Sequence, residues 1–159
     1  MVTTGKLPRN LVGILLVRMI ISHWAKRDPE DREIAMSKLP LGAQIGVAVI
    51  GCGRIGSLRA SLSSAHPGVR FLVLSDREQN KAEILAQRTG ADLAIADNER
   101  AINHPDVDIV FVSTPEHDHR DAIITALEAG KPVFVEKPIA LTLEDADAIL
   151  KACERTGTE

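Results

Sequence analysis

The chain has 159 residues, a length that is enough for a single domain with one hydrophobic core. Its content of 45% hydrophobic and 26% charged residues is typical of an ordinary globular protein. The net charge of −3 and the aromatic content of only 3% argue against a nucleic-acid partner, because such a partner requires basic patches and aromatic side chains that stack on bases.

The first 44 residues differ from the rest, and we expect them to be an extension or linker outside the fold. Residues 11–24 are apolar, but Arg18 interrupts them and they are too short to cross a bilayer, so no membrane partner is expected. Basic residues precede this run and no small-residue cleavage site follows it, which argues against a secretory signal peptide. Residues 28–33 are mostly charged and typical of a linker. We therefore expect residues 1–35 to be dispensable for folding.

From residue 45 onward, short apolar runs alternate with helical patterns. Strands are predicted at residues 45–50, 71–75, 93–96, 109–113 and 133–135, and helices at residues 55–65, 78–89, 98–102, 119–128 and 143–155. Thr142, with Asp145 three positions later, predicts the cap that begins the last helix. The regular alternation is typical of βαβ units. It predicts an α/β fold, a Rossmann-type doubly wound parallel sheet with strand order 3-2-1-4-5.

A glycine-rich motif follows the first predicted strand directly. Its members are Gly51, Cys52, Gly53, Arg54, Ile55 and Gly56. In a dinucleotide-binding motif, Gly51 permits the tight turn, Gly53 lets the backbone approach a pyrophosphate, and Gly56 lets the helix pack closely on the strand. The free N–H groups at the start of the helix then hold the phosphates. The alternative is a glycine-rich turn that binds no ligand.

Asp76 and Arg77 directly follow the second predicted strand, about 20 residues after the motif, where the ribose of a dinucleotide binds. A carboxylate at this position accepts hydrogen bonds from the ribose hydroxyls and repels the 2′-phosphate of NADP, so the sequence predicts NAD in preference to NADP. Arg77 opposes this prediction, because an arginine there can pair with the phosphate or stack on the adenine. A third interpretation is that Asp76 only caps the following helix.

Two further groups of candidates follow the fourth and fifth predicted strands. They are Ser113, Thr114, Pro115 and His119 in the first group, and Glu136 and Lys137 in the second. Lys137 comes at the carboxyl end of a strand, where open α/β sheets bind their ligands, and a lysine can take the proton of a substrate hydroxyl. Alternatively, Lys137 is a solvated loop residue. Glu136 either orients Lys137 or faces water.

Histidines and cysteines do not predict a metal site. His117 and His119 flank Asp118, but two histidines at this spacing with one aspartate are a poor ligand set for zinc. The two cysteines, Cys52 and Cys153, show neither a paired spacing nor a metal-ligand pattern. They are typical of free thiols in a reducing compartment, so we expect a cytoplasmic protein without a bound metal.

Three separated segments resemble the glucose–fructose oxidoreductase / inositol dehydrogenase family (Gfo/Idh/MocA), specifically its N-terminal nucleotide-binding domain. The segments are residues 50–56, residues 113–115 with His119, and residues 129–138. The resemblance implies an oxidoreductase that transfers hydride between NAD(P) and a sugar, cyclitol or related polyol. It also implies that Lys137 is catalytic beside the nicotinamide, that His119 lies near the cofactor and that Pro138 takes a cis bond. Glu116 departs from the family, where asparagine is frequent, and this leaves the contacts near the ribose open.

Members of this family carry a second domain that binds the sugar or cyclitol and contributes catalytic residues. We expect this chain to be the cofactor half of such an enzyme, with the substrate domain absent. Residues 45–159 would then be a dinucleotide-binding Rossmann domain that is truncated before its sixth strand. On this interpretation a polyol substrate binds only if a second domain is supplied. The alternative is a non-catalytic nucleotide-binding module that acts as a sensor or partner subunit. The sequence leaves homo-oligomers open.

Overall fold

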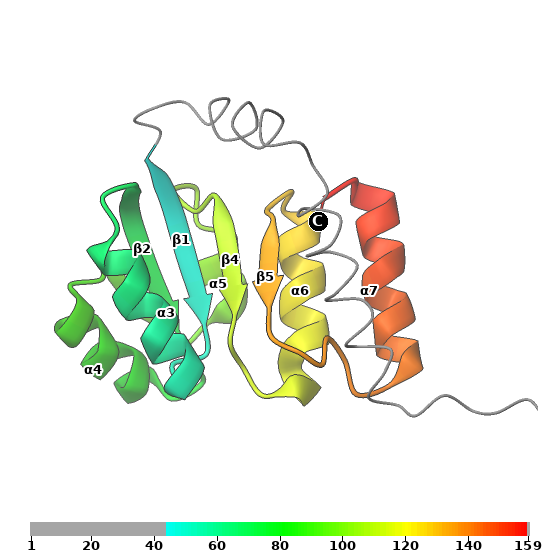
Figure 1. Cartoon of the computed structure of the whole chain (residues 1–159), viewed down its shortest axis with the longest axis horizontal. Helices are drawn as coiled ribbons and strands as arrows, with labels where there is room; N and C mark the ends of the chain where they lie inside the picture. The colour runs from blue at the N-terminus through cyan, green and yellow to red at the C-terminus, as the bar shows by residue number, and fades with distance from the viewer. Residues whose placement is uncertain (1–43, 159) are drawn as a thin grey trace, which may run out of the picture. The chain divides into compact units, whose positions relative to one another are not determined.

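The computed structural model describes residues 44–158, which form a parallel five-stranded sheet with helices on both faces (Figure 1). The strands are β1 (Ile45–Ile50), β2 (Val69–Ser75), β3 (Leu93–Ile95), β4 (Ile109–Val112) and β5 (Val133–Val135). Their order in the sheet is β3-β2-β1-β4-β5, which confirms the predicted topology. The predictions made for residues 1–43 lie outside the described residues.

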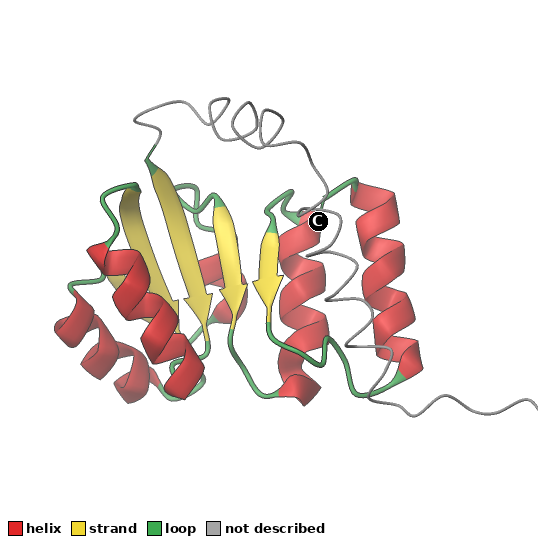
Figure 2. Ribbon diagram, viewed as in Figure 1, coloured by secondary structure: helices red, strands yellow, loops and turns green. Residues whose placement is uncertain are grey.

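The helices are α3 (Arg54–Ala65), α4 (Gln79–Thr89), α5 (Asn98–Ile102), α6 (His119–Glu128) and α7 (Leu143–Thr156), with a short 3₁₀ turn, η1 (Glu116–Asp118), before α6 (Figure 2). Helix ends follow from side-chain chemistry. Asp97 accepts a hydrogen bond from the backbone N–H of Arg100 at the start of α5, and Thr142 accepts one from Asp145 at the start of α7. Gly90 adopts the left-handed conformation that ends α4.

The core consists of two apolar layers, one on each face of the sheet. Alternate residues of β1 point to opposite faces: Val47 and Val49 pack with α3 and α4, whereas Ala48 and Ile50 pack with α5, α6 and α7. Because both faces are covered, the central strands are continuous apolar runs, and this is why they were recognisable in the sequence.

Several element bounds differ from prediction by one or two residues. β2 begins at Val69 rather than at residue 71, because Val69 pairs with Ile45 at the start of β1. α4 begins at Gln79, since Glu78 keeps an extended backbone and is the cap. β4 ends at Val112, and Ser113 lies in the loop beyond it. The Lys137–Pro138 peptide bond is cis, as the family resemblance implied.

Candidate cofactor-binding site

A cleft of about 790 Å³ lies at the carboxyl ends of the strands, the edge to which all arrowheads point in Figure 1. It is formed by the loops after β1, β2 and β4, together with the first turns of α5 and α6. β1 lies between β2 and β4, so the cleft opens where the strand order reverses, the position at which doubly wound sheets bind ligands. The lining residues are Gly51, Gly53, Arg54, Ile55, Asp76, Arg77, Glu78, Lys81, Asn98, Glu99, Ile102, Ser113, Thr114, Pro115, Asp118, Asp121, Ala122 and Thr125.

The glycine-rich turn requires glycine at two positions for packing and leaves the third open. Gly51 has φ +93°, and a Cβ there would lie 2.7 Å from the carbonyl oxygen of Ser113. A Cβ on Gly56 would lie 1.8 Å from the carbonyl oxygen of Gly51. A Cβ on Gly53 would meet no atom within 4 Å, so the fold does not demand glycine there. The open space over Gly53 is what a closely approaching phosphate requires.

Helix α3 begins without a side-chain cap, at residues that line the cleft. Its cap residue is Gly53, which has no side chain to bond the first N–H groups. The first N–H groups of an α-helix lack partners within the helix, and the helix dipole favours negative charge there. Arg54, at the first position of α3, lines the cleft and is exposed. The start of α3 is therefore a suitable site for a pyrophosphate.

Asp76 joins the loops after β1 and β2. Its Oδ2 accepts a hydrogen bond from the N–H of Cys52 at 2.8 Å, and its Oδ1 accepts one from the N–H of Glu78 at 3.0 Å. A carboxylate oxygen has a second lone pair, so both oxygens can still accept from a ribose hydroxyl. The structural role and the predicted ribose-binding role of Asp76 are therefore compatible.

Cys52 contributes packing and a backbone donor to the turn. Its side chain is buried, and Sγ donates a weak hydrogen bond to the carbonyl oxygen of Ser75 at 3.6 Å. Burial, reinforced by the nearby Asp76 carboxylate, raises the pKa of the Cys52 thiol to about 12. The thiol therefore stays protonated and unreactive at neutral pH.

The hydroxyl groups of Ser113 and Thr114 are buried without a hydrogen-bond partner among the described residues. Both residues line the cleft, and the N–H of Ser113 donates to the carbonyl oxygen of Ile50 at 2.7 Å, which places them directly beside the glycine-rich turn. Buried hydroxyls in native proteins almost always have partners, so two neighbouring exceptions need an explanation. A polar ligand in the cleft supplies one.

Charged side chains in the cleft are mostly paired. Arg77, in the loop after β2, forms an ion pair with Asp118 of η1, and Lys81 donates to Oε1 of Glu78 at 2.5 Å. The hydrogen bond to Glu78 and the charge of Glu78 raise the pKa of Lys81. Five carboxylates and three cationic side chains line the cleft, so its charge is net acidic.

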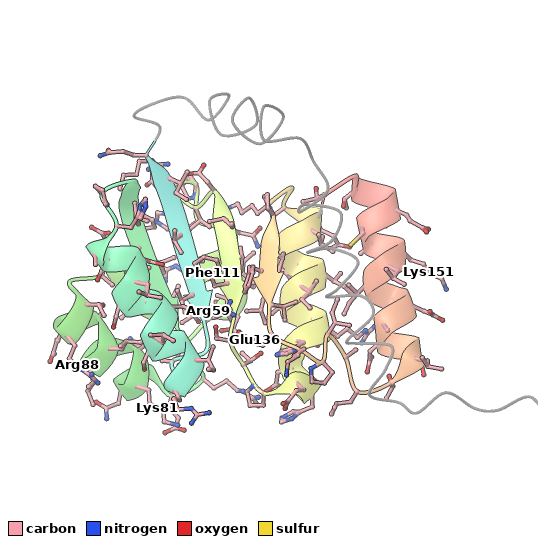
Figure 3. All side chains as sticks on the ribbon, viewed as in Figure 1. Arg59, Lys81, Arg88, Phe111, Glu136 and Lys151 are labelled. Carbon is pink, nitrogen blue, oxygen red and sulfur yellow. The ribbon has the colours of Figure 1, made fainter. Side chains whose placement is uncertain are left out.

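The loop after β5 is held to α3. Glu136 forms an ion pair with Arg59, and the Arg59 guanidinium lies over the rings of Phe134 and Phe111, with its carbon 4.4 Å and 5.5 Å from the ring centres. Figure 3 shows Arg59, Phe111 and Glu136 together in the middle of the view. Glu136 therefore pairs with Arg59 of α3. The sequence had suggested that Glu136 either orients Lys137 or faces water, and it did not suggest this ion pair. Lys137 is exposed at the end of β5 and is not among the residues that line the cleft.

His119 joins the loops after β4 and β5. It is 1% exposed, with Nε2 3.0 Å from the carbonyl oxygen of Thr114 and Nδ1 3.1 Å from that of Pro138. Both ring nitrogens are therefore directed at backbone oxygens, and a direct contact of His119 with a cofactor stays a prediction. His117 is exposed, with Nε2 3.4 Å from Oδ2 of Asp118. Within residues 44–158, no group of three or more candidate ligands is arranged around a common metal position.

Several residues that line the cleft were not predicted from the sequence, and Asp118 was considered only as a metal ligand. Arg59, which holds Glu136 but does not line the cleft, was also not predicted. Asn98 lines the cleft, and its Oδ1 accepts a hydrogen bond from Ser75 Oγ at 2.7 Å. The position of Asn98 at the start of α5 was a usable signal, because helix starts at the carboxyl edge of a sheet face the ligand cleft.

Residues 45–159 match a protein family described as "Oxidoreductase family, NAD-binding Rossmann fold". The chain is 36% identical over 115 residues to scyllo-inositol 2-dehydrogenase (NAD(+)) of Bacillus subtilis (strain 168), an alignment that covers 72% of this chain and 34% of that protein. The chain thus spans about a third of the length of this relative. None of the helices in the described part of the chain has the length and apolar character needed to span a bilayer.

Solved structures with related folds include two enzymes. Apo scyllo-inositol dehydrogenase from Lactobacillus casei superimposes with a TM-score of 0.68 at 25% identity, covering 73% of this chain and 35% of that one. A 3-ketoreductase from Actinomadura kijaniata, in complex with TDP-benzene and NADP, superimposes with a TM-score of 0.64 at 29% identity, covering 72% of this chain and 36% of that one.

Proposed function

This chain belongs to the oxidoreductase family with an NAD-binding Rossmann fold, and from that premise we propose that it binds a nicotinamide dinucleotide in the cleft at the ends of β1, β2 and β4. The observation that carries the proposal is that the buried hydroxyls of Ser113 and Thr114, beside the glycine-rich turn, have no partner in the described part of the chain. A dinucleotide lying across the turn offers them ribose and phosphate oxygens. The open space over Gly53 and the start of α3, which has no side-chain cap, fit the pyrophosphate of the same ligand.

We further propose that the chain is the cofactor half of a dehydrogenase that acts on a hydroxyl group of a sugar, cyclitol or related polyol. When bound, the nicotinamide accepts or donates the hydride in such a reaction. The protein must then move the hydroxyl proton, and Lys137 at the end of β5 is the candidate for that step. The alternative, a non-catalytic sensor or partner subunit, has no observation in its favour.

NAD is proposed as the preferred cofactor. Asp76 lines the cleft at the end of β2, and its carboxylate can accept both ribose hydroxyls while repelling a 2′-phosphate. The ion pair between Arg77 and Asp118 supports the same preference, because the cation nearest to Asp76 in sequence already has a carboxylate partner. A cytoplasmic location completes the proposal, since both cysteines are free thiols.

Titration of NADH into the purified chain by calorimetry tests the placement of the cofactor. The Gly53→Val variant is the sharpest perturbation, because a Cβ at this position meets no protein atom within 4 Å and points into the space proposed for the ligand. We expect NADH binding to weaken by about tenfold or more, a typical cost of forcing extra atoms into a packed contact. Ser64→Val, at the exposed far end of α3, is the matched control and should bind NADH like the wild type.

Equal NADH affinity in the wild type and Gly53→Val would contradict the placement of the pyrophosphate at α3. A wild-type chain that binds neither NADH nor NADPH would contradict the proposed function itself. Thermal unfolding of each variant without ligand shows whether it is folded under the conditions of the titration.

A further inference from the structure

The ion pair between Arg77 and Asp118 joins two loops on opposite sides of the cleft. Arg77 follows β2 directly, whereas Asp118 ends the 3₁₀ turn η1 that follows β4. Both residues line the cleft, together with Asp76. The Arg77 side chain is 68% exposed and that of Asp118 is 27% exposed, so the aspartate is the more buried of the two partners.

Two other cations line the cleft. Lys81 is bound to Glu78, and the charge of Asp76 also helps to raise its pKa, so Lys81 lies near Asp76 as well. Arg54 lies at the start of α3, where the pyrophosphate is expected. A 2′-phosphate on the ribose carries nearly two negative charges and requires a cation within contact distance. Arg77 and Lys81 are the side chains near Asp76 that can provide that cation. Each is paired with a carboxylate: Lys81 with Glu78 of its own segment, and Arg77 with Asp118 of another loop.

We propose that Asp118 is a specificity-determining residue: it holds the Arg77 guanidinium on the η1 side of the cleft, withholds it from a 2′-phosphate and so favours NAD over NADP. This inference rests on the proposed function, in which the cleft binds the adenosine half of a dinucleotide. It differs from the contribution of Asp76, which acts by direct repulsion. A second carboxylate, from another loop, determines whether the neighbouring arginine is available to the cofactor.

The test measures the dissociation constants of NADH and NADPH by calorimetry and compares their ratio between variants. Asp118→Asn keeps the shape of the side chain and removes its charge, which frees Arg77. We expect the affinity for NADPH relative to NADH to rise by about fivefold, the magnitude of one exposed ion pair. All titrations are run at one pH, because His117 Nε2 also lies 3.4 Å from Oδ2 of Asp118.

Two further variants separate the pairing with Arg77 from the general charge of the cleft. Asp121→Asn removes one negative charge from the same cleft, but Asp121 contacts Arg120 at 3.5 Å and not Arg77. We expect it to change the NADPH-to-NADH ratio by less than about twofold. In an Arg77→Ala background, Asp118→Asn should have no larger effect than Asp121→Asn, because the cation that it frees is gone.

An unchanged ratio in Asp118→Asn would overturn the inference while leaving dinucleotide binding intact. A full effect of Asp118→Asn in the absence of Arg77 would overturn it as well, since the carboxylate would then act by repulsion alone. A wild-type chain that binds no dinucleotide would instead overturn the proposed function. Circular dichroism and thermal unfolding of each variant establish that its fold is retained.

Discussion

Removing the hydroxyl groups of Ser113 and Thr114 should affect stability and cofactor binding in opposite directions. Neither buried hydroxyl has a hydrogen-bond partner within residues 44–158, and a buried unsatisfied hydroxyl costs about 1–3 kcal/mol. Thr114→Val keeps the volume of the side chain and removes this cost. We therefore expect Thr114→Val to raise the free energy of unfolding of the cofactor-free protein by about 1 kcal/mol, which raises its melting temperature by about 4 °C.

The same variant should bind NADH less tightly. If the dinucleotide is the missing partner, each lost hydrogen bond weakens binding by about 1 kcal/mol, or about fivefold. The double variant Ser113→Ala/Thr114→Val should then lose about twentyfold in NADH affinity. Differential scanning calorimetry of the free protein and isothermal titration with NADH measure the two effects on the same samples.

A matched control is available in α4. Thr89 Oγ1 donates a hydrogen bond to the carbonyl oxygen of Leu85 at 2.9 Å, so Thr89→Val removes a hydroxyl that already has a partner. It should lower stability slightly and leave NADH binding unchanged. Destabilisation of Thr114→Val by 1 kcal/mol or more, with NADH affinity unaltered, would show that these hydroxyls serve the fold and would refute the reasoning.

Three further predictions concern other parts of the domain. The folded-state pKa of Cys52, about 12, lies above its unfolded value, so Cys52 contributes its full stability below about pH 9 and loses it as the pH rises toward 12. The free energy of unfolding measured in urea should therefore fall more between pH 8 and 10 for the wild type than for Cys52→Ala. Parallel pH dependences of the two proteins would contradict this. Lys131→Met should destabilise the domain by about 1–3 kcal/mol, because Lys131 Nζ donates to the carbonyl oxygens of Ile102 at 2.6 Å and His104 at 2.7 Å. An unchanged melting temperature would show that these two hydrogen bonds contribute nothing to stability. The chain on its own should bind NADH, but it should not oxidise myo-inositol when NAD⁺ is supplied, since Lys137 is exposed and does not line the cleft. Robust NADH production from NAD⁺ and myo-inositol by the chain alone would contradict this prediction.

The order of the elements was predictable because each rests on local information. Strands buried on both faces read as apolar runs, and turn residues such as Gly90 separate them from helices. The parallel alternation then restricts the topology, because crossover connections are right-handed and sequential strands tend to be neighbours. The ends of elements were less accurate, since they depend on pairing with a distant strand, as Val69 does with Ile45.

The candidate site was predictable in its composition but not in its contacts. The loops at the carboxyl ends of parallel strands must gather at one edge, so the sequence indicated which segments meet there. It did not indicate that Arg77 pairs with Asp118, because a surface arginine has many rotamers and its partner is decided by the distance between two loops.

The contacts of Glu136 and Pro138, on either side of Lys137, could not be predicted from the local sequence. Glu136 is held by Arg59 of α3, and the Pro138 carbonyl oxygen lies 3.1 Å from Nδ1 of His119 in α6. The lysine is therefore flanked on both sides by residues bound to the two helices that also form the cofactor cleft. The motif indicated that a lysine follows this strand, but the contacts that hold its neighbours come from α3 and α6. Arg59 and Glu136 are 77 residues apart along the chain, and His119 and Pro138 are 19 residues apart. Contacts at such separations depend on the packing of whole helices against the sheet, and a sequence pattern of a few residues carries no information about them.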